Sequence, residues 1–223
     1  DSDKPFVMLE SDAKRTYVAQ SGLIGLNGPD SSRGGRPMYA VAKTAYTLAD
    51  AKSVASKDGK THQVLTVPLV FKTPEGVEVI KSFTFTQGDY PITVKHQVVN
   101  RSQQNWQGQM FGQLKRDNSD DPGKSSQGIF TLGTYLGGAW GTPEEPYNKL
   151  KFANFNDEKL NVEAKGGWVA MVQHYFVSAW IPGKLKLTQA DGQPYTAKLE
   201  SRQSADSMNI IGFTSPVINV PAG

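Results

Sequence analysis

The sequence predicts an all-β domain built mostly from antiparallel strands. Apolar and polar residues alternate over short runs, and these runs are rich in Val, Thr and Phe. Turn residues interrupt them about every 8–12 positions, and the chain contains 22 Gly and 13 Pro. This combination is typical of a β-sandwich. We therefore expect one mostly-β domain over residues 1–223.

The middle of the chain carries the clearest alternation. A first run ends at the turn residues 73–76, a second run ends at the turn residues 87–89, and two further runs follow. Within each run, the apolar residues share one face of a strand. They are, in order, Leu65, Val67, Leu69 and Phe71; Val77, Val79, Phe83 and Phe85; Ile92, Val94, His96 and Val98; Trp106, Met110 and Leu114. Pro68 places part of the first run at a sheet edge or a bulge.

The segment from Gly167 to Ile181 is apolar on both alternating faces. A strand with two dry faces lies centrally in a sheet that is covered on both sides. A buried helix is the alternative, but the β-branched and aromatic residues and the flanking Gly167 and Pro182 favour a strand.

The best helix signal is short and lies at residues 142–145. Thr142 suits an N-cap, Pro143 the first helical position and Glu145 a capping box, while Pro146 keeps such a helix short. Two polar segments, 49–61 and 116–128, are expected to be long loops or hairpin tips.

Composition limits the class of protein. A chain of 223 residues can bury a sizeable core without staples. The absence of Cys excludes disulfide scaffolds, thiolate metal sites and cysteine nucleophiles. The formal charge of +3 comes from interspersed charges, which is unlike the basic stripe of a nucleic-acid-binding protein. The sequence has no apolar run long enough for a membrane span. The chain opens on Asp1 without an initiator Met, so we expect an excised domain.

Three loop motifs resemble ligand sites without meeting their requirements. Gly123-Lys124-Ser125 lacks the first glycine of a P-loop, because Asn118 stands there. Residues 117–121 resemble the start of a calcium loop, but its sixth and twelfth positions are Pro122 and Gly128. The spacing of Gly22, Gly25 and Gly28 does not match a dinucleotide-binding loop. We interpret all three as turns or polar loops.

No catalytic, cofactor or metal site is predicted. The chain has neither a G-x-S-x-G elbow nor an H-E-x-x-H helix, and His62, His96 and His174 lie far apart. We interpret each histidine as a hydrogen-bonded core or interface residue. The sequon at Asn100 carries little weight, because such triplets are common by chance.

Aromatic residues gather between Phe130 and Phe155, among glycines, prolines and charges. Tyr and Trp on such connections often form binding surfaces, because they offer large contact area at low entropic cost. Tyr135, Trp140 and Tyr147 are therefore the predicted partner surface. The alternative is that these loops fold back and bury their own aromatic side chains.

Several strings resemble the large periplasmic domain of the YidC membrane protein insertase family. They are, in order, Leu9-Glu10; Tyr17-Val18-Ala19-Gln20-Ser21-Gly22-Leu23; Asn27-Gly28-Pro29-Asp30; Phe111-Gly112-Gln113-Leu114-Lys115; Lys165-Gly166-Gly167-Trp168-Val169-Ala170-Met171; Tyr175-Phe176; and Ala179-Trp180-Ile181-Pro182. Their order and spacing fit over nearly the whole chain.

The resemblance implies a β-supersandwich of the galactose-mutarotase type with one or two short helices. It places the domain in the periplasm of a Gram-negative bacterium, between the first two transmembrane helices of an inner-membrane protein. It implies a non-catalytic accessory role, with SecDF of the Sec translocon and membrane protein substrates as partners. The closing strand and helix and the flanking membrane helices are expected to lie outside residues 1–223.

The same fold resemblance leaves a carbohydrate-binding or mutarotase-like function as the alternative. Such enzymes need a general acid and a general base that face one sugar. His174 is the one strand histidine at a plausible position, and no partner Glu is identifiable in the sequence. A sugar site would therefore be sought near His174 and Trp168.

Overall fold

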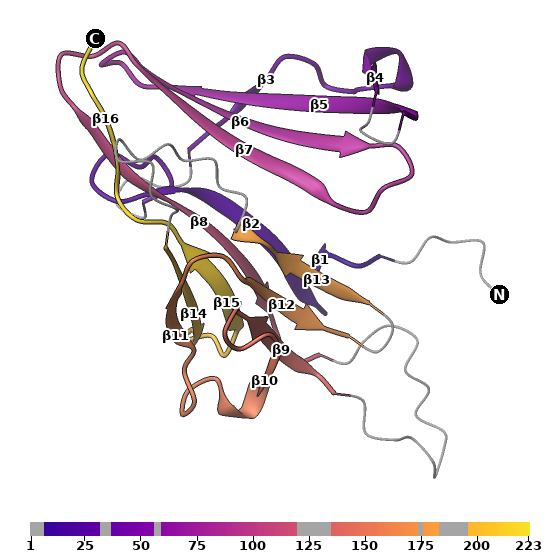
Figure 1. Ribbon diagram of the computed structural model, residues 1–223. Helices are drawn as coiled ribbons and strands as arrows, with labels where there is room; N and C mark the ends of the chain where they lie inside the picture. Colours follow the sequence, from indigo (N-terminus) through magenta and orange to yellow (C-terminus); the bar gives the residue numbers. More distant parts are fainter. Residues whose placement is uncertain (1–6, 32–36, 56–58, 120–134, 174–175, 183–195) are drawn as a thin grey trace. The chain divides into compact units, whose positions relative to one another are not determined.

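A computed structural model describes residues 7–31, 37–55, 59–119, 135–173, 176–182 and 196–223 (Figure 1). Its sixteen labelled strands form three sheets, and the pairings between the described strands whose register is defined are antiparallel. The predicted all-β class is confirmed. The helical segments among the described residues are the 3₁₀ turns η2 (Leu48–Asp50) and η3 (Phe152–Asn154).

The largest sheet has the order β1-β2-β8-β15-β14-β11, and β16 also pairs with β8. A second sheet has the order β10-β9-β12-β13, and a third has the order β3-β5-β6-β7 with β4 beside β5. The strands are β1 (Glu10–Ser11), β2 (Thr16–Ile24), β3 (Ala40–Val41), β4 (Lys52–Ala55), β5 (Thr61–Lys72), β6 (Val77–Thr86), β7 (Ile92–Asn100), β8 (Trp106–Arg116), β9 (Gly137–Gly141), β10 (Asn148–Lys151), β11 (Asn161–Ala164), β12 (Trp168–Val172), β13 (Val177–Trp180), β14 (Ala197–Gln203), β15 (Asn209–Thr214) and β16 (Ile218–Val220).

The chain divides into two compact units. The first unit comprises residues 1–21 and 109–216, and the second comprises residues 22–108 and 217–223.

The first unit is a sandwich of two sheets. Along β15, Ile211 and Phe213 point towards the second sheet, where Trp180 meets the Phe213 ring at a centroid distance of 6.1 Å. A Cβ on Gly138 of β9 would lie 3.0 Å from both Ile211 and Phe155. The core between the sheets therefore requires a residue without a side chain at this point of β9.

The outer face of the same large sheet is polar. Glu200 lies between Lys198 and Arg202, with N–O distances of 3.6 and 3.9 Å, and Arg202 donates a hydrogen bond to Gln113 at 2.9 Å. Gln113 in turn donates to Gln20. The alternation of a dry and a solvated face explains the period of two in these strands.

The second unit is built on the long hairpin of β5 and β6. Its register places the predicted apolar residues of β5, β6 and β7 on one face, because Leu69 pairs with Lys81 and Lys81 pairs with His96. Pro68 lies in β5 between the segments that pair with β3 and β4, so the described strands leave that edge open there. The predicted edge position of Pro68 is confirmed.

The turn after β2 depends on two glycines and an aspartate. A Cβ on Gly22 would lie 2.4 Å from the Asp30 carboxyl carbon, and one on Gly28 would lie 2.4 Å from the Ile24 main chain. Asp30 accepts hydrogen bonds from the Leu23 N–H and the Tyr39 hydroxyl. Gly25 and Gly28 therefore lie in the connection after β2, as interpreted from the sequence, whereas Gly22 lies within β2.

Two local predictions are wrong. Residues 167–181 do not form one strand but two, because β12 turns back into β13 and Gln173 N–H donates to Phe176 O at 2.8 Å. Residues 142–145 form a hairpin bend between β9 and β10 instead of a helix. Thr142 still uses its hydroxyl to cap the Glu145 N–H at 3.0 Å.

The polar segment 49–61 contains β4, which pairs with the start of β5. Much of the segment 116–128, including Gly123-Lys124-Ser125, lies outside the described residues. None of the helical segments in the described part of the chain has the length and hydrophobicity to cross a membrane.

Candidate functional site

Strand β9 has the sequence Gly-Gly-Ala-Trp-Gly, and its glycines make room for aromatic rings. A Cβ on Gly137 would lie 2.6 Å from the Tyr135 hydroxyl oxygen. A Cβ on Gly141 would lie 2.7 Å from Nε1 of Trp168. These two rings can therefore lie flat against the outer face of the sheet only because β9 has no side chains there.

Four residues form a continuous cluster on this outer face, which we call the aromatic surface: Tyr135, Tyr147, Lys149 and Trp168. The rings of Tyr147 and Trp168 are 6.0 Å apart between centroids. The Lys149 ammonium lies 5.0 Å from the Tyr135 ring centroid and 5.9 Å from that of Tyr147. Cation–π attraction thus orders a charged side chain between two aromatic rings.

The aromatic surface remains accessible in part. Tyr147 is 55% exposed, and Lys149 is exposed as well. Burial raises the pKa of Tyr135 to about 12, so its hydroxyl stays protonated at neutral pH and donates to Gly138 O at 2.6 Å. Tyr135 is thereby fixed, while Tyr147 and Lys149 remain exposed to solvent.

The structure separates Trp140 from the other two predicted surface residues. Trp140 lies in β9 rather than in a loop, and it pairs with Asn148 and Val169. Val169 is fully buried, and Gly138 on the same face contacts the sandwich core. Trp140 thus points towards the inner face, away from Tyr135 and Tyr147. Sequence reasoning missed Lys149 and assigned Trp168 to the alternative sugar site instead of to this surface. The glycines of β9 are the signal that marks the face on which the rings lie.

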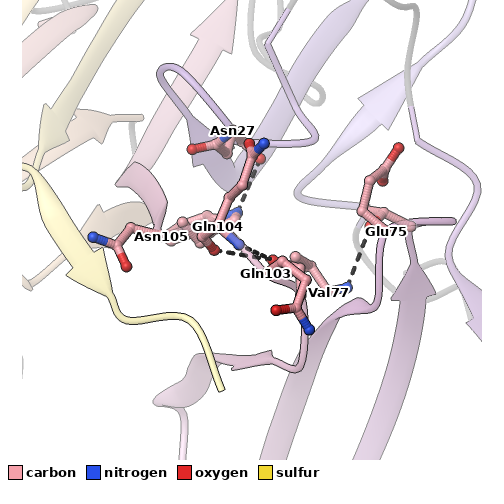
Figure 2. Close-up of a pocket in the computed structure, with 9 residues that line it drawn as sticks. Asn27, Glu75, Val77, Gln103, Gln104 and Asn105 are labelled. Carbon is pink, nitrogen blue, oxygen red and sulfur yellow. Dashed lines mark hydrogen bonds between the residues drawn. The ribbon is translucent and has the colours of Figure 1, made fainter.

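The second unit contains a pocket of about 380 Å³ (Figure 2). We call it the amide pocket, because four of its nine lining residues carry carboxamides. The lining residues are Asn27, Thr73, Glu75, Val77, Ser102, Gln103, Gln104, Asn105 and Trp106. The run Gln103-Gln104-Asn105 between two predicted strands is the signal that could have pointed to it.

Asn100, the sequon residue, has a structural role beside this pocket. Its side chain is 6% exposed, and its amide group donates to the carbonyls of Gln104, Val220 and Pro221 at 2.8, 3.2 and 2.9 Å. Its oxygen accepts from the Ser102 hydroxyl at 2.7 Å. The Asn100 side chain therefore clamps the segment around β16 to the turn before β8.

The histidines do not form a site within the described residues. His96 lies on the apolar face of β7, opposite Lys81, with both ring nitrogens shielded and without a hydrogen-bond partner among those residues. Burial and the charge of Lys81 lower its pKa to about 4. The predicted hydrogen bond of His96 is thus absent from the described part. His62 pairs with Val54 in the third sheet, and His174 lies outside the described residues.

Within the described residues, no three His, Cys, Asp or Glu side chains come together as they would to hold a metal ion. Of the calcium-like loop, Asp117 is described and accepts hydrogen bonds from Ser119 and from the Thr16 N–H, while the residues from 120 onwards lie outside the described part. The Asp117 carboxylate is thereby used to close the turn after β8.

The described residues define an all-β domain with an aromatic cluster on the outer face of one sheet. Over residues 1–223 the sequence matches the YidC periplasmic domain family. The chain belongs to this family.

Relatives in three genera show the same relationship. The chain is 42% identical over 219 residues to the membrane protein insertase YidC of Azotobacter vinelandii, which covers 98% of this chain and 35% of the relative. It is 43% identical over 221 residues to the membrane protein insertase YidC of Stutzerimonas stutzeri. This match covers 99% of this chain and 35% of the relative. It is 46% identical over 182 residues to the membrane protein insertase YidC of Alcanivorax borkumensis. This match covers 81% of this chain and 29% of the relative. The chain thus spans about a third of the length of these relatives.

Proposed function

We propose that this chain is a non-catalytic accessory domain of a membrane protein insertase. In this proposal it lies in the periplasm of a Gram-negative bacterium, as part of an inner-membrane protein. It contacts SecDF of the Sec translocon and segments of membrane protein substrates. Family membership supports the placement, since relatives of known name are membrane protein insertases about three times as long as the matched region.

The aromatic surface is the observation that carries the contact role. It contains exposed aromatic area, and Tyr and Trp are enriched in the buried centres of protein interfaces. The ammonium of Lys149 lies beside two of the rings. Tyr147 and Lys149 are the contact residues in this proposal, and Tyr135 and Trp168 support them. Trp140 stabilises the sheet from its inner face.

Site-specific photo-crosslinking in the full-length insertase, in its native membrane, tests this proposal. A photoreactive residue at position 147 is expected to capture a SecDF component or a substrate segment. The same residue at position 205 is the matched control, because Ala205 is exposed in a turn of the same unit. Capture from position 205 but not from position 147 would contradict the proposed surface.

Carbohydrate binding is the alternative that the fold resemblance left open. Trp168, the described residue of that predicted site, already packs against Tyr147. A titration with mono- and oligosaccharides separates the two functions, because a sugar site raises the melting temperature through mass action. The accessory role predicts no such shift.

A further inference from the structure

The amide pocket differs from the aromatic surface in its chemistry. A carboxamide presents one acceptor and two donor hydrogens, so it can pair with a peptide group in either direction. Figure 2 shows the side chains of Gln103, Gln104 and Asn105 around the pocket, with Glu75 on the strand hairpin beside them. The side-chain amides of Gln103 and Gln104 form no hydrogen bond with any described residue.

The neighbouring asparagines already bind extended main chain. Asn105 accepts the Ala222 N–H at 3.0 Å, and Asn27 accepts the Gln107 N–H at 2.8 Å. Asn100 donates to two successive carbonyls, those of Val220 and Pro221. Side-chain amides in this part of the unit therefore already form hydrogen bonds with the protein's own main chain.

Two features of the lining select among ligand classes. Trp106 is the aromatic residue of the lining, but it is 3% exposed and its Nε1 donates to Asn27 O, so it offers no face on which a sugar ring could stack. The charged residue of the lining is Glu75. A hydrogen bond from Thr73 holds the pKa of Glu75 below its usual value, so the carboxylate is ionised at neutral pH and disfavours anions.

We propose that the amide pocket binds the main chain of an extended, uncharged or basic polypeptide segment. Gln103 and Gln104 form paired hydrogen bonds with one of its peptide groups, and the Nδ2 groups of Asn27 and Asn105 donate to its carbonyls. The site lies in a different unit from the aromatic surface, so this inference goes beyond the proposed partner contacts and does not depend on them.

A peptide whose main-chain N–H groups are removed tests the proposal directly. The probe is a short, end-blocked Ala/Ser peptide, and its partner is the same peptide with N-methyl groups at alternate residues. NMR titration of the 223-residue chain is expected to shift the side-chain amide signals of Gln103 and Gln104 with the first peptide only. Equal binding of both peptides, or shifts confined to other residues, would overturn the proposal.

Glutamine-to-alanine variants inside and outside the lining of the amide pocket test which side chains bind the peptide. Loss of two hydrogen bonds predicts that Gln103→Ala/Gln104→Ala weakens peptide binding about tenfold or more. Gln107→Ala removes an exposed carboxamide outside the lining and is expected to leave binding unchanged. Equal weakening of peptide binding by both changes would contradict the assignment of Gln103 and Gln104 to the binding site. If a variant fails to fold, the comparison of the two peptides on the unsubstituted chain still tests the proposal.

Competing ligands complete the test. An otherwise similar peptide with Asp in place of Ser is expected to bind at least several times more weakly, because Glu75 repels it. A neutral oligosaccharide is expected to leave the glutamine signals in place. Tighter binding of the acidic peptide, or binding of the oligosaccharide instead of the neutral peptide, would show that the pocket recognises something other than main chain.

Discussion

At the scale of single residues, the environment of His96 conflicts with the chemistry of its side chain. It lies on an apolar face with Val94 and Val98, opposite Lys81, and its shielded nitrogens have no partner among the described residues. A charged imidazole there loses hydration and faces a second cation. The folded domain therefore holds His96 neutral.

This conflict predicts a loss of stability in acid. The pKa of His96 falls from 6.5 in the unfolded chain to about 4 in the folded domain, so the unfolded chain binds more protons between these values. His96 thus supports the fold fully above pH 6.5, and this support is lost as the pH falls through 4. The loss in unfolding free energy between pH 7.5 and 5 is about 2 kcal/mol.

Urea unfolding of the domain at these two pH values measures this loss. His96→Leu is expected to reduce the difference by that amount, because the titrating group is gone. His62→Leu serves as the matched control in the same unit and is expected to keep the full difference. An identical acid sensitivity in His96→Leu and the unsubstituted chain would show that His96 is solvated in the native state.

At the scale of elements, the short strand β16 is held by hydrogen bonds from the Asn100 side chain as well as by its main-chain pairing with β8. It pairs with β8 over three residues only, Ile218 to Val220. The Asn100 amide holds the carbonyls at its end, and buried hydrogen bonds of this kind are costly to remove. Asn100 therefore contributes to the local order of residues 217–223, together with the pairing to β8 and the bond from Ala222 N–H to Asn105.

Replacing this clamp is expected to loosen β16 before the rest of the domain. Asn100→Ala is expected to cost about 2–3 kcal/mol of unfolding free energy, because it removes three part-buried hydrogen bonds from a buried side chain. Hydrogen–deuterium exchange should then rise mainly in residues 217–223. Asn105→Ala removes one exposed hydrogen bond and is expected to cost less than about 1 kcal/mol. Exchange at residues 217–223 that does not respond to Asn100→Ala would argue against the clamp.

The elements also show what the sequence could predict. The strands from β5 to β8 were predictable, because glycine turns separate runs with a clear period of two, and Gly76 and Gly88 adopt the positive φ that those turns need. The turn between β12 and β13 was not, because no Gly, Pro, Asn or Asp marks it and apolar runs flank Gln173 and His174 on both sides. Residues 142–145 have the local signals of a helix start, but the pairing of β9 with β10 overrides them.

The structure brings together two of the three residues of the predicted partner surface. Aromatic content pointed to Tyr135 and Tyr147, but only the register shows that Trp140 faces the opposite way and that Lys149 lies between the two tyrosine rings. The sequence indicates which side chains lie near a surface, but it does not indicate which face of the sheet each one occupies. Pairing of strands decides which of them meet, since a shift of one residue changes the face.

At the scale of the whole molecule, stability and contact are carried by different residues. The chain has no cysteine, so its stability comes from dry cores such as the one around Ile211 and Phe213 in the first unit. The aromatic surface lies on the outer face of a sheet in that unit, and half-exposed rings with one cation contribute little to folding. A change confined to Tyr147 and Lys149 should therefore separate the two roles.

The double change Tyr147→Ala/Lys149→Ala is expected to lower the unfolding free energy by no more than about 1 kcal/mol, while Ile211→Ala costs about 2–5 kcal/mol by opening a cavity. In the full-length insertase, the double variant should accumulate normally and yet lose photo-crosslinks from a neighbouring position on the same face. Thermal unfolding of the domain and crosslinking in membranes measure the two effects separately. If the double change destabilises the domain as much as Ile211→Ala does, the aromatic surface is part of the fold's support, and the partner contacts must be sought elsewhere on the molecule.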